Sequence, residues 1–477
     1  MKKLFLACLS LVLCLTAAGC FGGNNNDKGD VNEGEGYDGG EVYLTFYHTM
    51  GQNLRDVLEA YIVEFNKLYP NIHIEHEQVG GYDDVRSQIS TELTAGESPN
   101  IAYCYPDHVA MYNSANAVQT LDSLINSTVE VEREDGSTEI LGLTDDQKND
   151  FIAGYYNEGK EFGDGKMYTL PFSKSTEVLY YNKTFFDENN IPLPDHWFSK
   201  DANDKTSMEA VCRQIKALDP TSIPLGYDSE GNLFITMCEQ LGSPYTSATG
   251  DNYLFNNDVN KNFCKQFRTW YQDALMTTQE LYGSYTSGLF VNQDNSKPKS
   301  YMSIGSSAGA THQRPTKVNG AYPFEVGITS IPQVDPANPK VISQGPSVCI
   351  FKKDDSQEVI ASWLFVKFLT TSVDFQAEFS MASGYVPVLQ SVTTNETYAN
   401  FLAKADGGDN VAALSAKVCV EQKDAYFTSP AFAGSSKARE EVGLLLTKLL
   451  SNAAEGGVDK LVDESFAQAV NNCKFYS

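Results

Sequence analysis

Three short segments in the first quarter of the chain place a tyrosine beside polar residues. They read YHTM at 47–50, GGYD at 80–83 and YPDH at 105–108. A sugar ring has an apolar C–H face that packs on a tyrosine ring, and its hydroxyl groups donate hydrogen bonds to carboxylate and amide oxygens. Segments of this kind therefore suit the binding of a neutral polyhydroxy compound.

Later parts of the chain offer further side chains of the same kinds. Asp228 and Asn232 could accept hydroxyl hydrogen bonds, and Tyr385 could supply another ring. A carboxylate that accepts such a bond makes a charge-assisted contact, which strengthens in a dry cleft. A ligand without the matching hydroxyl would leave the carboxylate unpaired, so the site would discriminate against it. Because a single tyrosine is more often a packing residue, the prediction depends on the joint placement of these segments.

The sequence lacks the signatures of common enzymes and metal sites. It contains no GxSxG motif, no P-loop, no HExxH and no CxxC. Asp83 and Asp84 are adjacent, so at a helix start they point in different directions, unlike the facing carboxylates of a glycosidase. We therefore expect a binding protein without catalytic activity, metal or cofactor. A membrane-anchored glycoside hydrolase, with one acidic pair hidden in the sequence, stays as a minor alternative.

The charge of the chain narrows the choice of partners. The 477 residues carry 62 acidic against 35 basic side chains, a formal net charge of -27. Such a surface repels phosphate backbones and anionic lipid headgroups, which argues against nucleic-acid binding and against a polybasic membrane patch. At roughly 100–200 residues per domain, the length allows two or three lobes with cores of their own.

The N-terminus has the features of an export signal. A basic start is followed by an apolar run at 4–15 and by AAGC at 17–20, which predicts a signal peptide over 1–19. The cysteine after small residues resembles the lipobox of bacterial lipoproteins, although Ala17 stands where that motif usually has leucine. The resemblance implies that Cys20 is acylated. The protein would then be extracytoplasmic and held to the bacterial cell membrane by lipid alone.

The segment 20–40 is rich in Gly, Asn, Asp and Glu, and it is expected to be a flexible tether. Strand and helix patterns then alternate: strands are expected at 41–48, 72–79 and 100–105, with helices at 53–69 and 82–95. This order predicts an α/β fold with a mostly parallel, doubly wound sheet. Ligands of such sheets bind beyond the carboxyl ends of the strands, where the three tyrosine segments lie.

The rest of the chain continues with strands and helices. A buried strand is expected at 178–182 after a polar run at 173–177, and a mainly helical region at 207–273 is interrupted by a loop at 226–232. A strand at 301–307 ends in small residues, a turn that suits a helix N-terminus whose N–H groups face a ligand. Further elements are a strand at 341–351 and an apolar helix at 357–369.

The ordered set of these segments resembles the substrate-binding proteins of bacterial ABC importers for carbohydrates, near the branch that binds glycerol phosphate. The similar motifs are FYHTM at 46–50, GYD at 81–83, VLYYNK at 178–183, Ser306-Ser307, Gly345 and GYVP at 384–387. The resemblance implies two lobes, each a mostly parallel sheet flanked by helices, joined by about three crossings that open and close as a hinge.

The crossings are expected near Ser175, Ser306 and Asp355. Lobe one would then comprise 41–174 and 308–355, and lobe two 175–307 and 356–477. The resemblance, together with the chemistry above, gives one set of predicted ligand-binding residues: Tyr47, His48, Tyr82, Asp83, Tyr105, Asp107, Ser175, Asp228, Asn232, Ser306, Gly345 and Tyr385.

The resemblance also bears on the ligand and the partner. Glycerol-phosphate binders carry an arginine in a C-terminal segment that contacts the phosphate, whereas 426–434 contains none here. Because a buried phosphate needs a guanidinium or comparable charge, a neutral sugar or oligosaccharide is favoured. A receptor for glycerol phosphate or a glycerophosphodiester is the alternative. The expected partner is a two-subunit ABC permease with cytoplasmic ATPases, served by a monomeric receptor.

Overall fold

The computed structural model describes residues 31 and 34–475 of the 477-residue chain. The predicted signal peptide at 1–19 and the predicted acylation site Cys20 lie outside the described residues, as does most of the predicted tether. Within the described part, no helix combines the length and the hydropathy that a membrane crossing requires.

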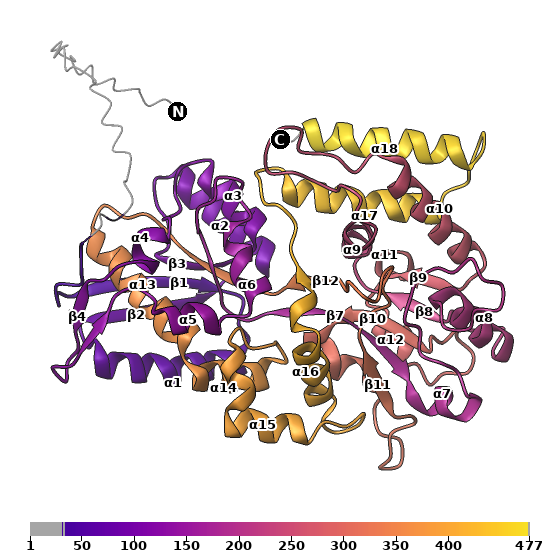
Figure 1. The fold of residues 1–477 in the computed structure, drawn as a ribbon, viewed down its shortest axis with the longest axis horizontal. Helices are drawn as coiled ribbons and strands as arrows, with labels where there is room; N and C mark the ends of the chain where they lie inside the picture. Colours follow the sequence, from indigo (N-terminus) through magenta and orange to yellow (C-terminus); the bar gives the residue numbers. More distant parts are fainter. Residues whose placement is uncertain (1–30, 32–33, 476–477) are drawn as a thin grey trace, which may run out of the picture.

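The described residues form a first lobe around a five-stranded sheet in the order β2-β1-β3-β13-β6 (Figure 1). Its strands are β1 (Val42–His48), β2 (Ile72–Gln78), β3 (Ile101–Cys104), β6 (Leu170–Pro171) and β13 (Ser347–Ile350). Strand β1 pairs in parallel with β2 and β3, whereas β13 is antiparallel to β3 and β6. The helices between the first strands are α1 (Gln52–Leu68), α2 (Tyr82–Thr94) and α3 (Pro106–Asn113).

The second lobe is built on a seven-stranded sheet in the order β14-β12-β7-β10-β8-β9, with β11 also paired to β7. Its strands are β7 (Ser175–Asn182), β8 (Leu225–Tyr227), β9 (Met276–Thr278), β10 (Met302–Ser306), β11 (Val326–Thr329), β12 (Val341–Gln344) and β14 (Tyr426–Phe427). Its larger helices are α8 (Met208–Leu218), α9 (Glu230–Gln240), α10 (Asp258–Gln272), α17 (Ser435–Ser451) and α18 (Val458–Phe475). Helix α17 packs on α9, α10 and α18.

The other described elements are a hairpin, further helices and four 3-10 turns. A hairpin is formed by β4 (Glu130–Glu132) and β5 (Thr138–Ile140). The remaining helices are α4 (Asp122–Ile125), α5 (Asp145–Asp150), α6 (Ala153–Asn157), α7 (Lys183–Asn189), α11 (Gln279–Tyr282), α12 (Ser287–Phe290), α13 (Ser356–Thr371), α14 (Val373–Ser383), α15 (Glu396–Ala403) and α16 (Val411–Glu421). The 3-10 turns are η1 (Glu158–Lys160), η2 (Ser307–Gln313), η3 (Gln390–Thr394) and η4 (Lys423–Ala425).

Within the described residues, the chain passes between the lobes at three places. The first lies between β6 and β7, and the second lies between β12 and β13, which belong to different sheets. The third follows α14, because α14 packs on α1 of the first lobe whereas α16 packs on β7 and β11 of the second. The α/β two-lobed fold predicted from the sequence is confirmed, and the first crossing falls at Ser175, where β7 begins.

The predicted boundaries of the lobes need correction elsewhere. Strands β11 and β12 lie within 308–355, the range expected in lobe one, but both pair with β7 in the second sheet. Helices α13 and α14 lie within 356–477, the range expected in lobe two, but they pack on β1 and α1 (Figure 1). Ser306 leads into η2, which stays in the second lobe, and Asp355 caps α13 instead of marking a crossing.

The reason is a break inside the predicted strand at 341–351. Gly345 has a φ of +87°, in the left-handed region that favours glycine, and Pro346 follows it. The strand therefore ends at Gln344, and the chain enters the other sheet at Ser347. One further expectation is wrong: 226–232 is not a loop, because it comprises the end of β8 and the first turn of α9 with only residues 228 and 229 between them. The buried strand expected at 178–182 is present and begins earlier, at Ser175.

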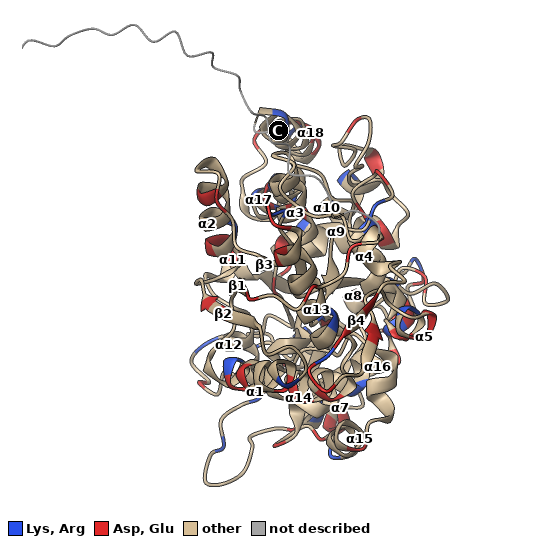
Figure 2. Cartoon of the chain, turned by 90° about the vertical axis from the view of Figure 1, so that its left-hand side faces the viewer, with Lys and Arg blue, Asp and Glu red and all other residues tan. Residues whose placement is uncertain are grey.

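In the view of Figure 2, acidic and basic residues are distributed over many elements, and the basic residues do not gather in one region. This view looks onto the end of the first lobe, where acidic segments occur on α2, β4 and α5 with basic segments between them. The distribution accords with the formal net charge of -27. Beneath this surface, Trp197, Trp270 and Trp363 are fully buried, so the largest rings fill cores and leave the tyrosines to line the cleft.

Candidate ligand-binding cleft

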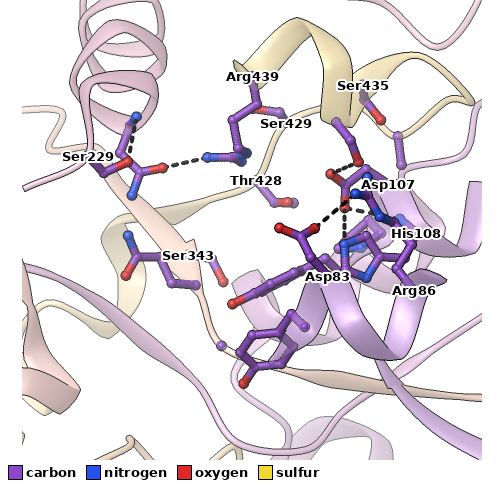
Figure 3. Close-up of a pocket in the computed structure, with 18 of the residues that line it drawn as sticks. Asp83, Arg86, Asp107, His108, Ser229, Ser343, Thr428, Ser429, Ser435 and Arg439 are labelled. Carbon is purple, nitrogen blue, oxygen red and sulfur yellow. Dashed lines mark hydrogen bonds and ion pairs between the residues drawn. The ribbon is translucent and has the colours of Figure 1, made fainter. Parts of the chain in front are cut away.

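A cavity of about 990 Å³ lies between the two lobes. Its first-lobe wall comes from the N-terminal ends of α2 and α3, and its second-lobe wall comes from α9, α17 and the loop before α17. Its floor is made by the crossing segments, with Ser175, Ser343 and Gly345 among the lining residues. Figure 3 shows side chains from both walls turned toward this space.

Tyrosine rings form one part of the first-lobe wall. Tyr82 is the first residue of α2, and Tyr105 is the N-cap of α3. Their ring centroids are 4.7 Å apart, and the Tyr82 hydroxyl lies 3.5 Å from the hydroxyl of Tyr385. Burial raises the pKa of Tyr82 and of Tyr105 well above the ordinary value for a phenol. Both rings are therefore neutral near pH 7, with hydroxyl groups that can donate or accept.

Acidic groups stand beside these rings. Asp107 accepts a hydrogen bond from the hydroxyl of Ser436, which belongs to α17 of the second lobe, so this contact spans the cleft. Asp83 pairs with Arg86 at 3.1 Å one turn along α2 (Figure 3). His108 is almost fully buried, and its burial lowers the pKa of the imidazole, so the ring is neutral near pH 7. The first-lobe wall thus offers carboxylate acceptors next to apolar ring faces.

The second-lobe wall orders its polar groups through a chain of hydrogen bonds. Asn232, in the first turn of α9, donates from Nδ2 to Glu177 Oε1 at 3.2 Å and accepts at Oδ1 from Arg439 of α17. The buried Glu177 also accepts from the Tyr227 hydroxyl. Burial, the dominant cause, raises the pKa of Glu177 to about 8. Glu177 thus orients the side-chain amide of Asn232, and this amide positions the Arg439 guanidinium at the edge of the cavity.

The structure brings nine of the twelve predicted ligand-binding residues to the cavity. They are Tyr82, Asp83, Tyr105, Asp107, Ser175, Asn232, Ser306, Gly345 and Tyr385. The positions come from distant parts of the chain, so their convergence is a property of the fold and not of any single segment.

Three predicted residues do not line the cavity. Tyr47 and His48 are still paired with β2, so their side chains remain within the sheet layers: Tyr47 donates to Glu92 at 3.1 Å, and the buried His48 contacts His76 at 2.9 Å. Asp228 accepts from the backbone N–H and the hydroxyl of Thr286 at 2.7 and 2.8 Å, which secures a turn. The placement of these three in the cleft was therefore wrong.

Several lining residues were missed. The stretch 426–434 contains no arginine, as noted from the sequence, but Arg439 lies only five residues beyond it, and Lys437 and Arg86 also line the cavity. Glu158 of η1 was missed as well. The only sequence signal for Arg439 is SSKAR at 435–439, a helix start with small residues that leave room for a ligand. Among the described residues, no group of three or more His, Cys, Asp and Glu could hold a metal ion.

Comparisons with known proteins agree with this architecture. The family model for bacterial extracellular solute-binding proteins matches residues 60–405. The "sn-glycerol-3-phosphate-binding periplasmic protein UgpB" of Salmonella typhimurium is 23% identical over 378 residues, which cover 77% of this chain and 78% of that protein. The protein of the same name from Shigella flexneri is 22% identical over the same length and shares.

Solved structures show the same fold. The cyclic alpha-maltosyl-1,6-maltose binding protein from Arthrobacter globiformis has a TM-score of 0.66 at 19% identity, covering 91% of this chain and 99% of that one. UgpB from Mycobacterium tuberculosis, in complex with glycerophosphocholine, has a TM-score of 0.66 at 14% identity, with 92% and 98% covered. The sugar-binding protein MalE from Xanthomonas citri reaches 0.69 at 17% identity, with 91% and 98% covered. The chain belongs to the family of bacterial extracellular solute-binding proteins.

Proposed function

We propose that this solute-binding protein of an ABC importer captures a neutral oligosaccharide between its lobes. The observation that carries the proposal is the arrangement of the first-lobe wall, where Tyr82 and Tyr105 stand beside Asp107. Two tyrosine rings next to a carboxylate match the apolar face and the hydroxyl rim of a pyranose. The nine predicted residues that line the cavity, together with Arg439, are the proposed ligand contacts.

The size of the cavity supports a ligand of more than one sugar unit. Ligand pockets commonly enclose about 300–1,000 Å³, and the value of about 990 Å³ lies at the upper end of that range. Binding requires no bond to be made or broken. Contacts from both lobes exist together only when the cleft is narrow, so the free energy of binding favours the closed form, which is presented to the permease.

A glycerophosphodiester is the second candidate ligand, and Arg439 is the observation that favours it. Arg439 forms no ion pair with any described residue, and it lines the cavity near Thr428 and Ser429 (Figure 3). A guanidinium placed in this way could hold a phosphate. Against this candidate, the same cavity is lined by five carboxylates, which disfavour an anion: Asp83, Asp84, Asp107, Glu158 and Glu440.

We further propose that a lipid at Cys20 and the segment 20–40 hold the monomeric receptor at the extracytoplasmic face of the bacterial cell membrane, close to its permease. The support is the AAGC sequence after the apolar run and the polar composition of 20–40. Radiolabelled palmitate should be incorporated into the full chain in a bacterial host and should be lost from a Cys20→Ser variant.

Calorimetry on the exported protein separates the two candidate ligands. The neutral panel is maltotriose, cellotriose, xylotriose and raffinose, and the anionic panel is glycerol 3-phosphate and glycerophosphocholine. We expect at least one neutral sugar to bind, with a stabilisation of about 2.7 kcal/mol at a hundredfold excess over Kd. If only the phosphate compounds bind, the neutral-oligosaccharide proposal is wrong and the protein is a glycerophosphodiester receptor.

Arg439→Gln sharpens this comparison. A phosphodiester receptor should lose nearly all affinity, because the phosphate loses its cation. A neutral-sugar receptor should lose at most one hydrogen bond to a charged group, roughly ten- to a hundredfold in affinity, and should still bind measurably. Arg213→Gln is the matched control, because Arg213 of α8 pairs with Glu209 and Asp273 and does not line the cavity.

A further inference from the structure

A buried ion pair lies where the lobes join. Lys174 Nζ is 2.5 Å from Glu158 Oε1, and the two side chains are 0% and 3% exposed. Burying two charges is costly unless their remaining hydrogen-bonding groups are satisfied. The ammonium meets this condition, because it also donates to the Gly345 carbonyl at 3.1 Å and to Ser347 Oγ at 3.0 Å.

Lys174 is in contact with all three crossing segments. It lies within the first crossing, between β6 and β7. Its side chain reaches Gly345, in the second crossing. Its backbone N–H donates to the Val386 carbonyl at 3.1 Å, and the Val386 N–H donates in return to the Lys174 carbonyl, which connects the segment after α14. A side chain that bonds to Lys174 is therefore connected to all three crossing segments, which together form the hinge between the lobes.

Glu158 connects this joint to the cleft. Its Oε1 accepts from Lys174 and from Ser347, and neither of these residues lines the cavity. Its Oε2 has one partner among the described residues, Ser343 Oγ at 3.2 Å, and both Glu158 and Ser343 line the cavity. Because a carboxylate oxygen can accept more than one hydrogen bond, Oε2 can take another donor from the side of the cavity.

We propose that Glu158 is a ligand-contacting residue whose Oε2 accepts a hydroxyl of the ligand at the floor of the cleft, with Lys174 as its positioning residue. This inference rests on the proposed function and narrows it, because the inner end of the ligand must be a hydroxyl donor and not an anion. Ser343 belongs to the second sheet and Glu158 to the first lobe. A ligand that bonds to Glu158 Oε2 therefore lies at the place where the two lobes meet.

Three variants separate binding from stability. Glu158→Gln leaves the Lys174 ammonium buried without a charged partner, so its melting temperature should fall strongly. The double variant Glu158→Gln/Lys174→Met replaces the ion pair by neutral groups of similar size, and its melting temperature should return close to that of the wild type. Glu161→Gln is the matched control, since Glu161 lies three residues further on and does not line the cavity.

The affinity of the double variant decides the proposal. The probe is the neutral trisaccharide of the panel that the wild type binds most tightly. The double variant should bind it roughly tenfold more weakly, because a neutral amide oxygen accepts a hydroxyl hydrogen bond less strongly than a carboxylate does, while Glu161→Gln should bind as the wild type does. A double variant with restored stability and unchanged affinity would overturn the proposal, since Glu158 would then serve only its ion pair.

Failure of this inference can be distinguished from failure of the proposed function. If the wild type binds no neutral sugar, the proposed function fails, and the inference fails with it. If the wild type binds and the double variant binds equally well, only the inference fails. Should the double variant not fold, Glu158→Asp decides: it keeps the charge but withdraws the carboxylate from the cavity. Weaker binding by that variant supports the proposal, and unchanged binding refutes it.

Discussion

At the scale of single residues, the second-lobe wall depends on an acid that never reaches the cavity. Glu177 is 1% exposed and receives hydrogen bonds from Tyr227 and Asn232. Desolvation of its carboxylate raises the pKa of Glu177 to about 8, because burial disfavours the charged form. Asn232 in turn accepts a hydrogen bond from Arg439, so the protonation state of a buried acid is connected to groups that line the cavity.

Glu177 should make the stability of the protein depend on pH. Its pKa in the folded protein, about 8, lies above the ordinary value of 4.5, so the folded state holds a proton that the unfolded chain releases between these two pH values. The free energy of unfolding should therefore decrease as the pH rises from about 5 to about 9, by roughly 1.4 kcal/mol per unit at most. Urea unfolding at pH 5, 7 and 9 measures this slope.

In Glu177→Gln the side chain does not titrate, so the free energy of unfolding should decrease less steeply with pH than in the wild type. The exposed Glu188 of α7 provides the control, and Glu188→Gln should keep the wild-type slope. Equal slopes for wild type and Glu177→Gln would mean that the buried carboxyl does not titrate in this range.

The residues that sequence reasoning found share one feature. Tyr82, Asp83, Tyr105 and Asp107 come directly after strands and begin the next helix, so the strand order alone predicts their side of the sheet. Arg439 and Glu158 belong to α17 and η1, neither of which follows a strand tip of the first sheet. Their positions depend on how α17 packs on α9 and how the crossings meet, which no local pattern specifies.

At the scale of elements, the second crossing is a short and closely packed connection. β12 and β13 are separated only by Gly345 and Pro346, yet they belong to different sheets. A Cβ atom on Gly345 would lie 2.6 Å from the Ser173 carbonyl oxygen and 3.0 Å from Lys174 Cα. The alternating pattern of 341–351 predicts strand correctly, but only the Gly-Pro pair indicates a break, and nothing indicates the change of sheet.

Gly345→Ala should be strongly destabilising. The left-handed conformation costs a residue with a Cβ about 1–2 kcal/mol, and overlap with the packed first crossing adds about 1–3 kcal/mol. The free energy of unfolding, measured in urea, should fall by the sum of both. Gly136→Ala is the control, because Gly136 has a φ of +77° in the β4–β5 hairpin with nothing within 4 Å of a new Cβ. An equal loss in both variants would exclude the contact with Ser173 as a cause.

At the scale of the whole molecule, the alternation of strands and helices predicted an α/β protein, and the family resemblance implied the two lobes that the structure has. The assignment of segments to lobes was not predictable in the same way. β11 is a short, largely buried strand without a pattern that distinguishes the two sheets, and it pairs with β7, the eight-residue strand that also pairs with β10 and β12. Pairing of this kind is a property of the folded chain, not of the segment.

The bond between Ser436 and Asp107 joins α17 to α3 across the cleft, so it is broken when the lobes separate. Ser436→Ala should therefore shift the equilibrium toward the open form and weaken ligand binding by roughly ten- to a hundredfold. Its melting temperature without ligand should stay near that of the wild type, since both cores are intact. Ser451→Ala, at the far end of the same helix, is the control.

Small-angle X-ray scattering measures the shift directly. Without ligand, Ser436→Ala should have a larger radius of gyration than Ser451→Ala, and a saturating neutral sugar should bring both to the same smaller value. The sugar closes both variants because its own contacts span the cleft. In Ser436→Ala, part of the free energy of sugar binding replaces the Ser436–Asp107 hydrogen bond that stabilises the closed form of the control, so the affinity is lower. Identical radii and affinities for the two variants would mean that the ligand alone determines closure.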